Sequence, residues 1–304
     1  MPMTNNKLYA RDDYLKKKAA DSNGLNIQLT NNYAFRKTFK NTYIAKGFLM
    51  ALLGLKENEI ADLKVTDPFE EGESEQEKEG ILDVKIYLNK KINIEMQNRY
   101  QNDWTERSLF YNCRMFTDGF YHGQSYGELE PCIHIGILDF NLMRSQGFHH
   151  HIKLLDIKTG EEYNDKLQFH VVQLKKLEDA VKEEKETELY YWAKLLAAKD
   201  WKEVDDTIKG NPYREAVKDE MYKMSQDERE RYLYLREEMA YSDEISRMKT
   251  AREAGLEEGR KEGKQLFLQC IRLKKQGFSK EKIAEECQVN IPEVEEILKE
   301  IEDL

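Results

Sequence analysis

The sequence predicts an α/β fold in which a mixed sheet is flanked by helices and followed by an α-helical C-terminal region. Two runs alternate between apolar and polar residues and are joined by a short turn, which is typical of a β-hairpin. A near-continuous apolar run follows, as in a strand that is covered on both faces. Strand patterns end near Leu177, and the remaining residues have helical propensity. The expected order is helix, strand, hairpin, helix, strand and hairpin, then helices alone.

The first elements come before the alternating runs. A helix is expected over Asn31–Leu55, where apolar side chains recur at three- and four-residue spacing and Gly54 ends the pattern. A short strand at Leu63–Val65 precedes the turn at Asp67–Pro68. The charged stretch Glu70–Glu79 contains no apolar side chain, so we expect an exposed loop there.

The alternating runs Ile81–Leu88 and Ile92–Gln97 predict the first hairpin. Their apolar faces match only when the numbers of paired residues have an even sum. A tight turn near Asn89 then favours Val84 opposite Ile94.

A second helix is expected over Trp104–His122, with Asp103 as its N-cap. Five side chains should form its inward apolar stripe: Leu109, Phe110, Cys113, Phe116 and Phe120. The apolar run Cys132–Phe140 predicts a strand buried on both faces. His149–Ile157 and Leu167–Leu174 predict a second hairpin.

Residues 179–304 are expected to form a helical region behind a domain of residues 1–178. Within it, residues 277–298 resemble a helix-turn-helix, but glutamates dominate the second helix. An acidic helix fits a DNA groove poorly, so protein contact is the favoured role.

Three glycines of the tail recur at four-residue spacing, at Gly255, Gly259 and Gly263. They predict either close helix–helix approach in a homo-oligomer or a flexible linker.

Composition limits the class of protein. The net charge of −10 argues against a chain that coats nucleic acid by bulk charge. The acidity lies mainly in the tail, because residues 1–178 hold 24 Lys and Arg against 26 Asp and Glu. The sequence has neither a run of about 18 apolar residues nor an N-terminal signal-peptide pattern, which predicts a cytoplasmic protein without membrane partners. The four cysteines lack CxxC spacing and should be free thiols, and His149–His151 should be surface histidines because no ligand-spaced cysteine or acid joins them.

Two carboxylates and an amide share one face of the first hairpin. The expected register puts Asp83 directly across from Glu95, at a Cβ separation of about 5 Å, and Gln97 points to the same side. Paired carboxylates at that distance suit Mg²⁺, with Mn²⁺ as an alternative. A metal could acidify the attacking water of a phosphodiesterase, and Gln97 could orient it. The alternative is that these polar residues form the solvent-exposed face of a half-buried hairpin.

Five motifs extend this pattern along the chain: NNYAFRKTF (Asn31–Phe39), KEGILDVK (Lys78–Lys85), INIEMQ (Ile92–Gln97), ERSLFY (Glu106–Tyr111) and GILDF (Gly136–Phe140). In this order they resemble the Rpn family of recombination-promoting nucleases and transposases, within the PD-(D/E)XK nuclease superfamily. The resemblance covers roughly residues 28–178. Its most specific part is the ExQ of the second strand together with the upstream LDV.

The resemblance implies a restriction-endonuclease-like core, Mg²⁺ dependence and double-stranded DNA as substrate. It also implies that Asp83 and Glu95 are metal ligands and that Gln97 stands where the superfamily carries a catalytic lysine. Gln97 offers a neutral dipole in place of a cation. Family members often carry an acid where this chain has Asn32. The neutral Gln97 implies lower intrinsic activity or a substitute cation, and Asn32 implies that a supporting carboxylate from the first helix is absent.

Several residues are candidates to bind phosphate or support catalysis. Lys78 and Lys85 lie near the first carboxylate. Arg107, Tyr111 and Arg114 fall on the face of the second helix opposite its apolar stripe, and the family pattern also has an Arg and a Tyr in this helix. Arg107, near the helix N-terminus, suits a phosphate. The alternative is that these are ordinary solvated or ion-paired residues, which we favour for Arg114.

The sequence therefore predicts a Mg²⁺-dependent DNA endonuclease linked to recombination, mobile DNA or defence. The helical tail would serve assembly or regulation. The rival hypothesis is a catalytically degenerate nuclease fold that acts as a DNA- or protein-binding module.

Overall fold

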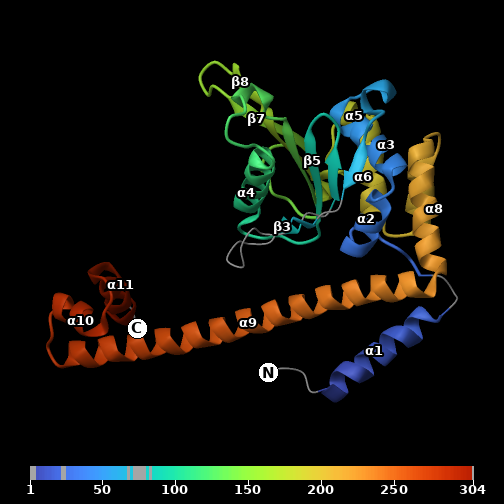
Figure 1. The fold of residues 1–304 in the computed structure, drawn as a ribbon. Helices are drawn as coiled ribbons and strands as arrows, with labels where there is room; N and C mark the ends of the chain where they lie inside the picture. The colour runs from blue at the N-terminus through green and yellow to red at the C-terminus, as the bar shows by residue number, and fades with distance from the viewer. Residues whose placement is uncertain (1–4, 22–24, 67–68, 71–79, 82–83, 303–304) are drawn as a thin grey trace. The chain divides into compact units, whose positions relative to one another are not determined.

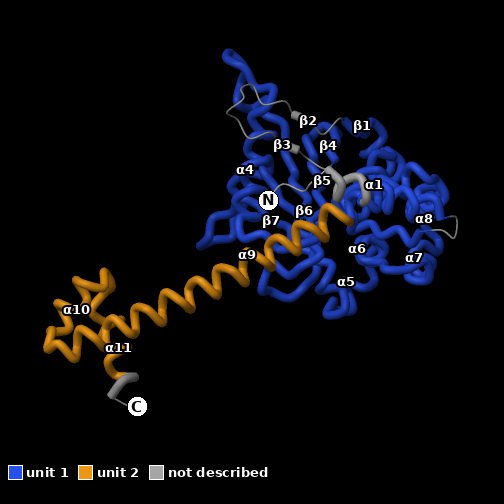
Figure 2. The backbone as a smooth tube through the Cα atoms, turned by 90° about the horizontal axis from the view of Figure 1, so that it is seen from below, with its two compact units in different colours: residues 1–238 blue, residues 239–304 orange. Residues whose placement is uncertain are grey.

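The computed structural model describes residues 5–21, 25–66, 69–70, 80–81 and 84–302 of the chain. The chain folds into two compact units, residues 1–238 and residues 239–304 (Figure 2). Each unit has its own cluster of buried apolar side chains.

A six-stranded mixed sheet forms the centre of the first unit. Its strands are β1 (Lys64–Thr66), β4 (Val84–Tyr87), β5 (Lys91–Gln97), β6 (Cys132–Leu138), β7 (His149–Leu155) and β8 (Glu162–Gln173), in the spatial order β1-β4-β5-β6-β8-β7. Strands β5, β6 and β8 run parallel, and the other pairs are antiparallel. A separate two-stranded pair consists of β2 (Phe69–Glu70) and β3 (Gly80–Ile81). The expected mixed sheet and both hairpins are confirmed.

The register of the first hairpin is the predicted one. Val84 pairs with Ile94 across β4 and β5, and Asn89 in the turn adopts a left-handed conformation with φ of 48°. Asparagine tolerates this region better than most residues, which explains why the turn falls there. Leu82 and Asp83 lie outside the described residues, so the predicted pair between Asp83 and Glu95 does too.

The prediction of a single helix over Asn31–Leu55 is wrong. The chain forms two helices there, α2 (Asn32–Phe39) and α3 (Thr42–Leu53). The side chain of Asn41 accepts a hydrogen bond from the backbone N–H of Tyr43 at 3.0 Å and so begins a new helix. Apolar spacing continues through the break because both helices pack on the same core, and the cap is a local signal that periodicity does not detect.

Helices cover both faces of the sheet (Figure 1). Helix α4 (Trp104–Thr117) lies on one face, and α2, α3 and α6 (Glu188–Ala197) lie on the other. Trp192 of α6 is fully buried, with its ring centroid 5.7 Å from that of Phe48 and 6.5 Å from that of Phe39. Residues far apart in the sequence thus build one core.

The remaining α-helices of this unit precede or follow the sheet in the sequence. They are α1 (Asn5–Ala19), α5 (Lys182–Lys185), α7 (Trp201–Ile208), α8 (Pro212–Gln226) and the start of α9 (Glu228–Lys275). Buried side chains from α7, α8 and α9, among them Val204, Val217 and Tyr234, belong to the same core cluster as the sheet. The unit therefore extends some 60 residues past the boundary expected after residue 178. Helical propensity alone does not reveal that these helices cover the sheet.

Removal of residues 239–304 is expected to leave the first unit folded, with a melting temperature within a few degrees of that of the full chain, because its core contains none of those residues. Cutting after residue 178 should instead abolish cooperative unfolding, since it removes Trp192 and its neighbours from the core. Calorimetry on both fragments checks this. A cooperative transition in the shorter fragment would show that the helices after residue 178 are not an essential part of the core.

The second unit contains the end of α9 with α10 (Lys280–Cys287) and α11 (Ile291–Glu302). Its small core consists of Cys270, Ile283, Ala284, Val294 and Leu298. The sulfur atoms of Cys270 and Cys287 are 3.8 Å apart, a proximity that the sequence spacing did not predict, although both thiols are free as expected.

The three glycines of the tail lie within α9, and a Cβ added at any of them would meet no described atom within 4 Å. No helix in the described part of the chain is long and apolar enough to cross a membrane.

Candidate active site

The odd-numbered residues of β5 face α4. Ile92, Ile94 and Met96 point into the main core, so Asn93, Glu95 and Gln97 point to the opposite face. Glu95 is only 5% exposed and Asn93 only 1%. The interpretation of this face as a solvent-exposed hairpin surface is therefore wrong for Glu95.

Glu95 receives two donors on one oxygen. Arg107 of α4 donates from Nη2 to Glu95 Oε1 at 2.5 Å, and Gln97 donates from Nε2 to the same atom at 2.6 Å. The other terminal nitrogen of Arg107 donates to Gln101 Oε1 at 2.7 Å. A buried carboxylate is costly unless it is paired and hydrogen-bonded, and this arrangement supplies both. Of the candidate cations, Arg107 is the one that contacts a predicted metal ligand in the described structure.

Strand β6 contributes a residue that the sequence argument missed. His134 is fully buried, its Nε2 lies 3.6 Å from Glu95 Oε2, and its Nδ1 lies 3.2 Å from Asn93 Nδ2. Burial, and then the positive charge of Arg107, lower the pKa of His134 to about 3, so the ring is neutral at physiological pH. A polar residue inside an otherwise apolar strand was the signal that could have found it.

Helix α4 presents its polar side to the sheet. Its buried residues are Trp104, Ser108, Asn112 and Met115, and the expected inward residues Leu109 and Phe110 are each 50% exposed. The predicted stripe of α4 is wrong: Cys113 is exposed too, and Phe116 and Phe120 are only partly buried.

Two contacts explain the orientation of α4. Asn112 donates to the backbone carbonyl of Gln168 on β8 at 3.0 Å. Trp104 packs against Gly136 of β6 so closely that a Cβ there would lie 2.3 Å from the indole. The strand face beneath α4 carries Asn93, Glu95 and His134, so a polar helix face satisfies it better than the apolar stripe would.

The other predicted residues are distributed as follows. Lys85 Nζ lies 3.6 Å from the carboxylate of Asp118, at the end of α4. Tyr111 is partly buried and its ring contacts that of Phe110. Asn32 begins α2, and its buried side-chain oxygen forms no hydrogen bond within the described part of the chain. Lys78 and Asp83 lie outside the described residues.

The donor set fits a hard divalent cation only in part. Glu95 offers a carboxylate, the ligand that Mg²⁺ and Mn²⁺ prefer, on a central strand. Among the described residues, no group of three His, Cys, Asp or Glu side chains is arranged to hold a metal ion. The second carboxylate predicted for the site, Asp83, is not among them.

The histidine run lies on the edge strand β7. The rings of His149 and His151 stack on His170 of β8, with centroids 5.1 and 4.1 Å away, and His149 Nε2 lies 2.9 Å from His170 Nδ1. His151 is exposed, but His149 and His150 are only partly so. Burial, and then the charge of neighbouring histidines, lower the pKa of His149 to about 4 and that of His170 to about 3.

Acidification should destabilise the fold through these histidines. In the unfolded chain they take up protons near pH 6.5, whereas in the folded chain they stay neutral to about pH 4. The free energy of unfolding should therefore fall by roughly 1 kcal/mol per pH unit for each histidine between about pH 6.5 and 4. Urea denaturation at several pH values measures this. His170→Gln should flatten the dependence and the exposed His122→Gln should not; equal slopes for the two variants would refute the assignment.

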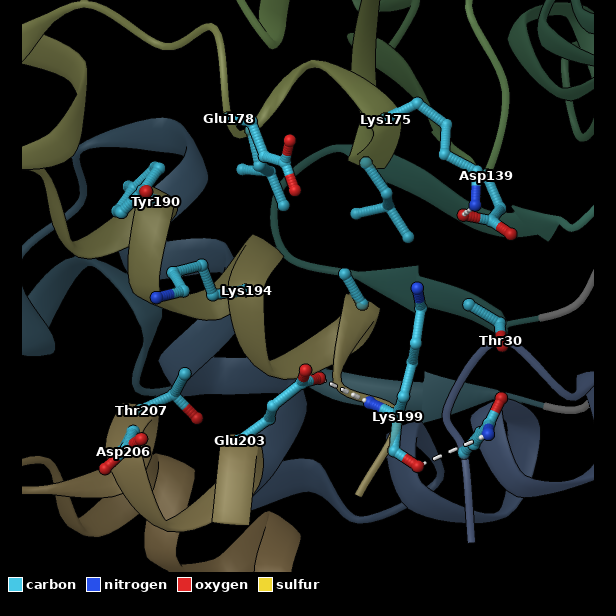
Figure 3. Close-up of a pocket in the computed structure, with 14 residues that line it drawn as sticks. Thr30, Asp139, Lys175, Glu178, Tyr190, Lys194, Lys199, Glu203, Asp206 and Thr207 are labelled. Atoms are coloured by element: carbon cyan, nitrogen blue, oxygen red, sulfur yellow. Dashed lines mark hydrogen bonds and ion pairs between the residues drawn. The ribbon is translucent and has the colours of Figure 1, made fainter. Parts of the chain in front are cut away.

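A pocket of about 520 Å³ lies between the ends of the parallel strands and helices α6 and α7 (Figure 3). Asp139, which directly follows β6, pairs there with Lys175 at 2.9 Å. Three lysines of the pocket are accompanied by four carboxylates, those of Asp139, Glu178, Glu203 and Asp206. This mixed lining does not favour phosphate, and neither Glu95 nor Arg107 lines the pocket.

Comparison with known proteins agrees with this geometry. No curated protein and no solved structure matches the chain. The model of one family, described as PD-(D/E)XK nuclease family transposase, matches residues 29–251. The match covers most of the chain, including the sheet, α4 and the helices that complete the core. With its mixed sheet flanked by helices in the restriction-endonuclease-like arrangement, the chain belongs to the PD-(D/E)XK nuclease family transposases.

Proposed function

We propose that the chain is a cytoplasmic, divalent-metal-dependent endonuclease that hydrolyses phosphodiester bonds of double-stranded DNA, in recombination, mobile DNA or defence. The observation that carries the proposal is the ion pair between the buried Glu95 and the partly buried Arg107. It joins a carboxylate on a central strand to a cation on the following helix, in a chain whose family is one of nucleases.

The proposed metal ligands are Asp83 and Glu95. Mg²⁺ is the expected ion, with Mn²⁺ as an alternative, because both prefer carboxylate oxygens. When bound, such an ion supplies a Lewis acid for the phosphate and lowers the pKa of a water molecule. Arg107 and Gln97 both donate to Glu95 Oε1, and these hydrogen bonds fix the orientation of the carboxylate.

Arg107 is the proposed substitute for the superfamily lysine. Gln97 is a neutral donor and cannot stabilise the negative charge that develops on the phosphate as well as a cation can. The guanidinium of Arg107 lies within hydrogen-bond distance of the same carboxylate oxygen as Gln97. It has five N–H donors, so it can orient Glu95 and still present donors to an oxyanion. Lys78, Lys85 and Tyr111 are proposed as supporting phosphate contacts.

A second candidate function is a DNA- or protein-binding module without catalysis. A buried arginine–glutamate pair can be purely structural, and the neutral Gln97 favours such a role. In either function the helical tail, with its glycine-striped α9, is proposed to mediate homo-oligomer formation.

A plasmid-nicking assay with the purified chain separates the two functions. The endonuclease should convert supercoiled plasmid to open-circular and linear forms with Mg²⁺ or Mn²⁺, and not with EDTA. A module without catalysis should leave the plasmid supercoiled under both conditions, and it should retard the DNA only if DNA is what it binds.

A further inference from the structure

His134 occupies the layer between the sheet and α4. It lies in the middle of β6, and its register partner on β5 is Asn93, two residues from Glu95. The side chain is fully buried, and the ring centroids of Trp104 and Phe169 lie 6.1 and 6.2 Å from its own. Such packing limits rotation of the imidazole, so the direction of its nitrogens is set by the fold.

The contact with Asn93 fixes which nitrogen carries the proton. An amide nitrogen can only donate, so Asn93 Nδ2 donates to His134 Nδ1 across 3.2 Å. A neutral imidazole that accepts at Nδ1 carries its hydrogen on Nε2. That N–H is buried, forms no hydrogen bond within the described part of the chain, and lies 3.6 Å from Glu95 Oε2.

The opposite tautomer of His134, with hydrogen on Nδ1, is inconsistent with the groups around the ring. If the Asn93 amide were turned, its oxygen would accept from Nδ1 and the lone pair of Nε2 would be the group nearest to the carboxylate. Two acceptors would then lie 3.6 Å apart in a buried site, which is electrostatically unfavourable. Only the tautomer with hydrogen on Nε2 places a donor opposite an acceptor at both contacts, with Asn93 and with Glu95.

We propose that His134 is a positioning residue for Glu95, an inference that rests on the proposed metal-dependent function. Its Nε2–H faces Oε2 of the carboxylate at 3.6 Å, while Arg107 and Gln97 donate hydrogen bonds to Oε1. Asn93 in turn sets the tautomer of His134. Residues that orient a metal ligand in this way commonly alter metal affinity by about 10–100-fold when they are replaced.

Two substitutions of His134 separate positioning from packing. The amide nitrogen of His134→Gln can stand near the site of Nε2 and donate to Glu95, whereas that of His134→Asn reaches only the site of Nδ1. Calorimetric titration of the full chain with Mn²⁺ should therefore give a dissociation constant about 10-fold or more higher for His134→Asn, and within about threefold of the parent for His134→Gln. His170→Asn is the matched control, a buried histidine of the same sheet, and should leave Mn²⁺ affinity unchanged.

A further readout needs neither metal nor activity. Nitrogen-15 NMR of the metal-free chain should find His134 protonated on Nε2 and accepting at Nδ1. Asn93→Leu, which leaves His134 in place, should abolish this tautomer preference and weaken Mn²⁺ binding in the direction of His134→Asn.

The outcomes are distinguishable. A parent chain that binds no Mn²⁺ overturns the proposed function and the positioning role together. A parent that binds Mn²⁺, with equal affinities for the Asn and Gln variants or with the Nδ1-protonated tautomer, overturns the role of His134 alone. If His134→Asn fails to fold, Asn93→Leu and the NMR tautomer decide.

Discussion

Replacing Glu95 with alanine is expected to lower the rate of Mg²⁺-stimulated DNA cleavage by about 10³-fold or more. Glu95 is the one predicted metal ligand among the described residues, and it is held by donors on the central strand and on α4. Its loss removes a carboxylate from the proposed metal site and leaves Arg107 beside a void. Single-turnover cleavage of supercoiled plasmid at saturating Mg²⁺ measures the change.

Glu162→Ala is a suitable control for this experiment. Glu162 is also a strand carboxylate in an ion pair, with Lys153 at 2.7 Å, but it lies in the exposed hairpin of β7 and β8. Its replacement should leave cleavage unchanged. If Glu95→Ala cleaved DNA as fast as Glu162→Ala, the site would be assigned to the wrong carboxylate.

Replacing Arg107 with alanine is expected to slow cleavage by about 10²–10³-fold, the usual loss when one charged or hydrogen-bonding group is removed from a developing oxyanion. Arg107→Lys should restore part of the rate, because it keeps the charge but cannot bond Glu95 and Gln101 together. Arg114→Ala, on the same helix, should have little effect. Equal rates for Arg107→Ala and Arg114→Ala would leave Arg107 with a structural role only.

Arg107→Ala should also lower the free energy of unfolding, because Glu95 would remain buried without its cation. Breaking such a pair typically costs on the order of 3 kcal/mol. The double variant Glu95→Gln with Arg107→Met should regain most of this loss and stay inactive. Urea unfolding and cleavage measured together thus separate the structural contribution of the pair from its chemistry.

The sequence predicts the sheet well because strand signals are local. The alternation on both sides of Asn89 determines the register of Val84 and Ile94, and any shift by one residue would turn every apolar side chain to the wrong face. The continuous apolar run of β6 correctly indicates burial on both faces. The importance of Arg107 follows from its place in the first turn of α4, although the sequence suggests phosphate rather than Glu95 as its partner.

Long-range packing explains what the sequence does not predict. Periodicity shows that Leu109 and Phe110 share a face of α4, but not which face meets the sheet. That depends on the polar layer of Asn93, Glu95 and His134, whose members come from two strands some 40 residues apart. The extent of the first unit depends likewise on side chains such as Trp192, which reach the core only after the chain has folded back.

Calorimetric titration with Mn²⁺ tests the central claim most directly, because it examines the proposed metal site without relying on turnover. The parent chain should bind one ion, and both Asp83→Ala and Glu95→Ala should lose that binding while still unfolding cooperatively. Unchanged Mn²⁺ affinity in either variant would contradict the claim that these two carboxylates form the metal site.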